Sequence, residues 1–334
     1  MKNKFWIALP VFLATMIFLL SCTEKSILAP SPLKAASPVI QHIESQYKTA
    51  DGLIASYAQT NTQKLSESVG LYMDYLLLTK DRERFYSLFQ ALQQELTVRE
   101  GDYVFIKWEK GTDVYVNALI DDLRIFEALQ KARHLFHYPP YEAFAKQLIR
   151  GEQKYGMRES LPVDFFDFKT KQQRDTLHLS YYKVSAMQKA HFKRETFAPL
   201  ENVKAEPFFP EVYRNGAYET SGNEVNMIDQ LLIAISYAEL LGKKENHFDH
   251  FLKQELQIKN QIYARYNRKT EGNMGENEST AVYALLVQYF ELTKQTENKN
   301  WALHKLKQMD TQNAQETHFF DYIHKELILT RERL

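Results

Sequence analysis

The chain has 334 residues, and its 42 basic and 42 acidic side chains give a formal net charge of zero. This balance argues against a nucleic-acid-binding protein, which would carry a basic excess. The 11 glycines and 10 prolines are too few for an all-β chain with many tight turns, and a single cysteine excludes a disulfide framework or a thiolate metal cluster. The length fits one large domain or two ordinary ones.

Residues 1–22 resemble a bacterial lipoprotein signal peptide. Lys2 and Lys4 supply positive charge ahead of the apolar run from Phe5 to Leu20, which is shorter than the roughly 20 residues of a membrane-spanning helix. In such signals the cysteine, here Cys22, is lipidated and becomes the first mature residue. We therefore expect an extracytoplasmic lipoprotein on the outer face of the cell membrane. An ordinary signal peptide or a membrane anchor is the alternative.

Residues 23–37 combine small residues, prolines and serines, which predicts a tether. From 38 to 334 we expect one folded domain in which two kinds of helix alternate. Helices that are apolar on most sides are expected at 67–79, 117–130, 176–189, 225–241, 278–291 and 317–329. Amphipathic helices are expected at 82–97, 140–155, 246–266 and 299–309.

The starts of the apolar helices recur about every 40–60 residues, which indicates a helical-hairpin repeat. An apolar helix is surrounded by other helices, whereas an amphipathic helix shows one face to water. The sequence therefore predicts an all-α fold, an (α/α)6 barrel of six inner and six outer helices. Residues 100–112 predict a short β-hairpin insertion, and the aromatic and acidic segments 160–175 and 206–222 predict loops that carry function.

Inner helices of such a barrel run in the same direction, so their first residues meet at one end. Acidic residues stand at or near these starts: Glu67, Asp121, Asp122, Glu224, Asp229, Glu278 and Asp321. Capping explains one polar residue per helix start, but Asp122 and Asp229 lie deeper, inside apolar runs. Buried carboxylates need partners or a changed pKa and are enriched at functional sites. An acidic mouth with aromatic side chains suits a carbohydrate.

Four stretches resemble motifs of the family 8 glycoside hydrolases and follow the family's order. Ser66–Met73 (SESVGLYM) resembles the family's Ser-Glu-Gly-Gln-Gly-Tyr-Gly-Met, and Ile120–Leu129 (IDDLRIFEAL) resembles Asp-Ala-Asp-Leu-Asp-Ile-Ala-Tyr-Ala-Leu. Leu179–Tyr182 (LSYY) is similar to Pro-Ser-Tyr-Phe, and Glu278–Leu285 (ESTAVYAL) is similar to Glu-Ser-Pro-Ala-Val-Tyr-Ala-Leu. The (α/α)6 barrel is also the fold that this resemblance implies.

The resemblance implies Glu67 as the general acid. Asp122 matches the second Asp of its motif, so Asp122, with Asp121, is expected to hold the sugar, and the third motif adds Tyr181 and Tyr182. The substrate-binding residues expected near the fourth inner helix are Glu224 and Asn226.

The catalytic base departs from the family pattern. The family commonly has Asp-Ala-x-Arg at the start of the fourth inner helix, whereas this chain has Asn226 at the position of that Asp and Asp229 at the position of the Arg. Asp229 and Glu224 are the candidate bases. We prefer Asp229 because Glu224 can be explained as an N-terminal helix charge.

These features predict an inverting endo-glycosidase that hydrolyses an exopolysaccharide or biofilm polymer, with Glu67 as acid and Asp229 as base. The resemblance is to exopolysaccharide hydrolases of Gram-positive bacteria. One alternative is a polysaccharide lyase that uses Tyr182 or His178 as base, and another is a non-catalytic polysaccharide-binding lipoprotein. The ten histidines lack metal-site spacing, so we expect no metal and no cofactor. We expect a monomer whose partners are the polysaccharide and the membrane.

Overall fold

The computed structural model describes residues 35–334, so the predicted signal peptide, Cys22 and most of the predicted tether lie outside the described residues. Residues Lys34–Leu334 cluster as one compact unit that contains the whole hydrophobic core of the described chain. No helix within residues 35–334 combines the length and the apolar composition needed to cross a membrane.

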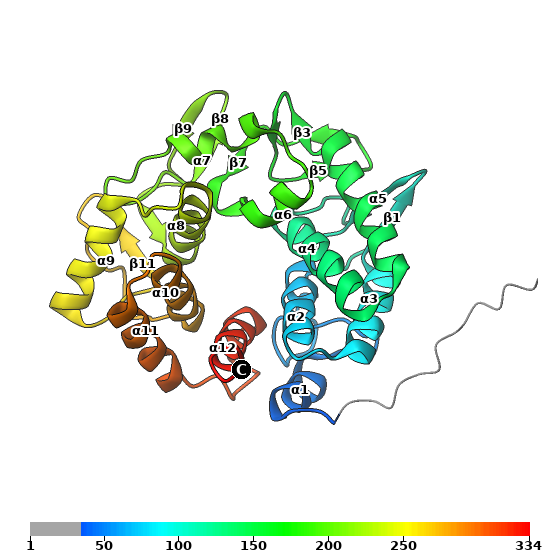
Figure 1. The fold of residues 1–334 in the computed structure, drawn as a ribbon, viewed down its shortest axis with the longest axis horizontal. Helices are drawn as coiled ribbons and strands as arrows, with labels where there is room; N and C mark the ends of the chain where they lie inside the picture. Colours follow the sequence, from blue (N-terminus) through cyan, green and yellow to red (C-terminus); the bar gives the residue numbers. More distant parts are fainter. Residues whose placement is uncertain (1–34) are drawn as a thin grey trace, which may run out of the picture. The chain divides into compact units, whose positions relative to one another are not determined.

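Six helical positions form an inner ring, as predicted (Figure 1). Five are filled by α2 (Ser66–Leu78), α4 (Leu119–Phe136), α8 (Met227–Leu241), α10 (Thr280–Leu292) and α12 (Phe319–Arg331). The third position holds only the 3-10 turn η2 (Leu179–Tyr181) and the short α6 (Val184–Lys189). Each position contacts the next, and α12 contacts α2, so the ring closes. The architecture is therefore the (α/α)6 barrel expected from the helical period.

Amphipathic helices form the outer layer. They are α3 (Arg82–Glu95), α5 (Pro139–Tyr155), α7 (Ala198–Asn202), α9 (Asn246–Lys259) and α11 (Thr296–Gln308). Helix α1 (Pro38–His42) and the π-helical turn η1 (Ile43–Tyr47), which the sequence did not predict, lie outside α12 and α2. The hydroxyl of Tyr72 in α2 donates to Glu44 at 2.9 Å, and the ring of His42 packs on Tyr322 of α12 at 4.8 Å. The N-terminal segment thus covers the seam where the ring closes.

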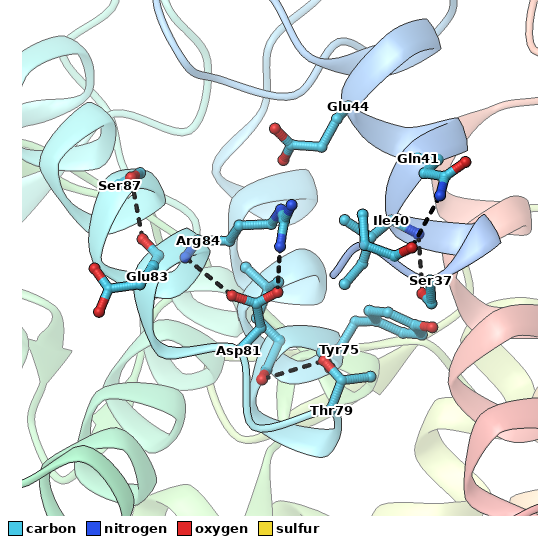
Figure 2. A network of polar contacts seen from close by, with 12 residues as sticks. Ser37, Ile40, Gln41, Glu44, Tyr75, Thr79, Asp81, Glu83, Arg84 and Ser87 are labelled. Carbon is cyan, nitrogen blue, oxygen red and sulfur yellow. Dashed lines mark hydrogen bonds and ion pairs between the residues drawn. The ribbon is translucent and has the colours of Figure 1, made fainter. Parts of the chain in front are cut away.

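The N-terminal segment runs along the ring in a defined direction. Tyr47 reaches the start of α12, where its hydroxyl donates to the carbonyl of Thr317 at 3.0 Å. Ser37 caps α1 ten residues earlier, and Figure 2 draws α1 in the same close-up as Tyr75 and the C-cap Thr79 of α2. The ring of His42 packs on Tyr322, whereas the ring of Tyr47 also packs on Phe319, one turn nearer the start of α12. At a rise of about 1.5 Å per helical residue the segment covers roughly 15 Å. It therefore runs from the C-terminal end of the inner helices toward their N-terminal end.

The third hairpin differs from the prediction of a continuous helix over 176–189. Residues Leu177–His178 form β7 and pair with β8 (Val212–Arg214), which pairs in turn with β9 (Ala217–Glu219). The helix begins only at Val184, because the preceding residues are held in extended and turn conformations by distant partners. The carbonyl of Tyr182, for example, accepts a hydrogen bond from Ser236 at 2.8 Å.

Two other boundaries shift for local reasons. Helix α9 ends at Lys259 rather than near 266, because Asn260 adopts a left-handed conformation with φ 51°. The following β11 (Arg265–Asn267) pairs with β10 (Glu224–Asn226). The insertion predicted at 100–112 is a hairpin of β1 (Thr97–Glu100) and β2 (Tyr103–Ile106). Two shorter hairpins pair β3 (Met157–Arg158) with β4 (Leu161–Pro162) and β5 (Phe166–Asp167) with β6 (Gln172–Gln173).

Candidate active site

The first turns of the inner helices meet at one end of the barrel, which we call the mouth. Ser66 at the start of α2 donates to the Oδ2 atom of Asp121 in α4 at 2.8 Å. Ser279, the N-cap of α10, donates to Asp321 of α12 at 2.8 Å. These contacts between neighbouring helix starts hold the acidic residues of different hairpins in one place, as the parallel arrangement predicts.

Glu67 lies in the first turn of α2, one residue after the helix begins at Ser66. The N-cap is Leu65 rather than Ser66, because the Ser66 hydroxyl serves Asp121 instead of the helix backbone. Burial raises the pKa of Glu67 to about 7, with a further increase from the negative charge of Asp121 and an opposing effect of Arg124. Glu67 therefore keeps its proton in mildly acidic solution, as a general acid must.

Asp121 is buried and faces the same space as Glu67. It accepts hydrogen bonds from Ser66 and, at 2.8 Å, from the Nη1 atom of Arg124, which also forms an ion pair with it. The Arg124 side chain passes Gly70 of α2, where a β-carbon would lie 2.9 Å from its Cδ atom. The glycine in the SESVG stretch thus makes room for the arginine that orients Asp121.

Asp122 points elsewhere. Its Oδ2 atom accepts from Asn117 at 2.9 Å, and Asn117 also donates to Glu152 of α5 at 2.7 Å. The carboxyl groups of Asp122 and Glu152 hydrogen-bond to each other, and burial raises the pKa of both, so the pair holds a proton between them. Asp122 therefore ties α4 to the outer layer, and the structure does not support the expectation that it binds sugar.

The two tyrosines of the LSYY stretch also lie in different surroundings. Burial raises the pKa of Tyr181, and the negative charges of Asp164, Asp121, Asp229 and Glu67 raise it further. Tyr181 thus lies among the acids of the mouth. Tyr182 is buried, and its hydroxyl donates to the carbonyl of Thr196 at 2.6 Å. Its ring belongs to the core, which does not support the expectation that Tyr182 contacts substrate or acts as a lyase base.

Asp229 lies in the first turn of α8. Burial raises its pKa, while the nearby Ser180 hydroxyl and the charges of His178 and Arg265 favour its ionised form. Asn226 caps the same helix by accepting from the backbone of Ile228 at 3.0 Å.

Gln230, the residue after Asp229, anchors the start of α8 to the segment that contains Phe209 and Glu211. Gln230 accepts from the backbone of Phe209 at 2.7 Å and donates to Glu211 at 3.0 Å. Glu224 is different, because its side chain is 58% exposed and pairs with Arg265 at 3.0 Å. Of the two candidate bases, Asp229 has the environment that perturbs a carboxyl group.

One component of the mouth was missed from the sequence. Asp164, in the loop before β5, is buried and accepts from the backbone of His178 at 2.5 Å and from its Nδ1 atom at 2.7 Å. This hydrogen bond raises the pKa of His178, which in turn lies close enough to Asp229 to affect its charge. The only sequence signal was an acid between apolar residues in a loop already expected to carry function.

The mouth therefore presents Glu67, whose pKa burial raises to about 7, and Asp229, whose pKa burial also raises while Ser180, His178 and Arg265 oppose this shift. Tyr181 lies among these acids. Two carboxyl groups in different environments can supply a proton and remove one.

We compared the chain with known protein families, sequences and structures. No family model matches the chain. The chain is 31% identical over 282 residues to "Putative lipoprotein YdaJ" of Bacillus subtilis, covering 81% of this chain and 75% of that protein. The crystal structure of PssZ from Listeria monocytogenes matches with 40% identity and a TM-score of 0.86, over 90% of this chain and 96% of PssZ.

More distant structures share the fold. Endoglucanase Cel10 from Klebsiella pneumoniae, a family 8 glycosyl hydrolase, matches with a TM-score of 0.63 at 14% identity, over 89% of this chain and 99% of that chain. The chain thus has a glycosidase-type fold, and it belongs to a divergent family, related to the family 8 glycoside hydrolases, that includes YdaJ and PssZ.

Proposed function

We propose that the protein is an extracytoplasmic endo-glycosidase that hydrolyses a bacterial exopolysaccharide by inversion. The observation that carries this proposal is Glu67, whose pKa of about 7 suits a proton donor, in a mouth that also holds Asp229. Proton donors of glycosidases have raised pKa values because of burial and neighbouring acids.

In the proposed reaction Glu67 gives its proton to the glycosidic oxygen while the bond from this oxygen to the anomeric carbon breaks. Asp229 removes a proton from a water molecule, whose oxygen attacks the anomeric carbon from the opposite face. The products are a free alcohol on one fragment and an inverted hydroxyl group on the other. Proton exchange with solvent then restores Glu67 and Asp229. Asp121 and Tyr181 hold the sugar ring between the two groups.

The substrate class follows from the mouth and from the predicted anchor. Acidic and aromatic side chains fit a neutral or amino-sugar polymer better than a polyuronate. A lipid on Cys22 would keep the enzyme on the cell surface, where it meets polymer secreted by the same cell, and the relative YdaJ is named as a lipoprotein. We propose that it works as a monomer, because one chain supplies the complete acid and base pair.

The proposal is tested by measuring new reducing ends from β-glucan, chitosan and Gram-positive exopolysaccharide, using residues 23–334 in water enriched in oxygen-18. We expect release by the parent protein, one oxygen-18 atom per new reducing end, and no release by Glu67→Gln. The matched control is Glu224→Gln, which removes an exposed carboxyl group near the mouth and should retain most activity.

Two other outcomes would replace the proposal. Products that absorb in the ultraviolet and carry no oxygen-18 would indicate a lyase, with His178 as the remaining candidate base. Polymer binding without cleavage by the parent or by the variants would indicate a binding lipoprotein, in line with the presence of Asn226 where the family commonly has its base.

The anchor is tested separately in cells. We expect Cys22→Ser to move the protein from the membrane fraction to the medium or to block its processing. Retention of a normally processed variant in the membrane fraction would contradict lipidation at Cys22.

A further inference from the structure

A groove of about 990 Å³ lies between α4, α5 and the residues that follow α6, outside the mouth. It exists because α6 has only six residues whereas α4 has 18, so the last turns of α4 lack a full-length inner neighbour. Apolar side chains of Phe126, Leu135 and Ile149 line it, and Leu135 is 39% exposed.

The polar lining of this groove is basic. None of its 11 lining residues is acidic, and six are basic: Lys131, His134, Lys146, Arg150, Lys189 and His191. Lys131, Lys183 and Lys189 form ion pairs with the buried Glu127. The buried carboxyl groups of Asp74 and Glu239 also lie close enough to these lysines to interact with their charges.

A second carboxylate nearby is also shared. Lys146 and Arg133 both pair with Glu142. Arg150 makes no ion pair within residues 35–334, and it is exposed. Six cations therefore face four carboxyl groups around the groove, and burial raises the pKa of two of these, Asp74 and Glu239. The site thus carries a local positive charge although the whole chain is neutral.

The groove lies at the end of the barrel opposite the mouth. Four of its five α4 residues, from Gln130 to Leu135, lie in the last two turns of that helix, whereas Asp121 of the mouth lies in its first turn. Helix α1 begins at this same end, and Figure 2 draws it in the same close-up as Tyr75 and Thr79 of α2. The predicted tether therefore joins the barrel on the side of the groove and away from the mouth.

We propose that this end of the barrel, centred on the basic groove, docks on the anionic phospholipid headgroups of the membrane that carries the lipid anchor. The proposal rests on the anchor at Cys22. A chain of the length of residues 23–37 can span roughly 50 Å at most, which limits how far the groove can lie from the bilayer. Basic side chains are attracted to an anionic membrane surface, and exposed apolar groups such as Leu135 insert at its edge. Docking in this orientation points the mouth toward the polymer outside.

The test measures binding of residues 23–334, which contain the complete core, to vesicles of phosphatidylcholine with or without one-third phosphatidylglycerol. We expect binding only to the anionic vesicles, and weaker binding as salt increases. Each lost cation should weaken binding about fivefold, so Lys146→Gln/Arg150→Gln should lose about 25-fold. The matched control Lys204→Gln/Lys269→Gln removes two exposed cations that lie outside the groove and should bind like the parent.

Three results would overturn the proposal: equal binding to neutral and anionic vesicles, an equal loss in the control variant, or binding of soluble polygalacturonate but not of vesicles. Hydrolysis is measured in parallel on soluble polymer, where the groove variant should match the parent. A protein that docks without hydrolysing would refute the proposed enzyme but not the docking surface.

Discussion

Replacing Glu67 by Gln should stabilise the protein, and more so as the pH rises. The pKa of this carboxyl group is raised from 4.5 in the unfolded chain to about 7 in the folded protein. The folded state therefore binds more protons between these values, so stability falls as pH increases through this window. A difference of 2.5 pKa units corresponds to about 3.4 kcal/mol, and partial solvent contact of Glu67 reduces this to about 2 kcal/mol between pH 5 and pH 8. Glutamine keeps the shape and does not titrate.

The assay is urea unfolding of the parent and of Glu67→Gln at pH 5 and pH 8. The variant should gain about 2 kcal/mol over the parent on going from pH 5 to pH 8. The control is Glu224→Gln, whose exposed carboxyl group should give no pH-dependent difference. A Glu67→Gln stability difference that is the same at both pH values would refute the raised pKa and, with it, the assignment of Glu67 as a ready proton donor.

Three further predictions concern the groups around Glu67. Asp229→Asn should lower kcat by about 10²- to 10⁴-fold without loss of stability, because the general base is lost and burial already disfavours the charged carboxyl group. A kcat within threefold of the parent would exclude Asp229 as the base. His178→Ala should move the acidic limb of the pH–rate profile to higher pH, since His178 favours the ionised form of Asp229. The control His247→Ala, at an exposed histidine, should leave the limb in place. An unmoved limb in His178→Ala would contradict the prediction. Asp122→Asn should retain activity, whereas Asp122→Ala should lose about 2 kcal/mol of stability by leaving buried partners unsatisfied; inactivity of a folded Asp122→Asn would restore a role in sugar binding.

The barrel was predictable because its signals are local. The apolar runs give α2, α8, α10 and α12 to within a few residues, and α8 and α10 begin after Asn226 and Ser279, which cap them through their side chains. The third hairpin was not predictable in the same way. Its apolar segment suits a helix or an extended chain equally, and pairing with Val212–Arg214, far along the sequence, selects the extended form.

The site was predicted only in part, for a geometric reason. Adjacent residues on a helix point about 100° apart, so the phase of α4 decides that Asp121 faces the mouth while Asp122 faces α5. Two acids in an apolar run do not reveal that phase. Asp164 was missed because it lies in a loop whose position depends on its bonds to His178.

The most direct test of the account is to determine the anomeric configuration of the first product. Proton NMR during hydrolysis of a β-linked polymer records this configuration. If Glu67 is the acid and Asp229 the base of a single displacement, the α-anomer forms first and then equilibrates with the β-anomer. Initial formation of the β-anomer would show retention, and it would contradict the assignment of Asp229 as a base acting on water.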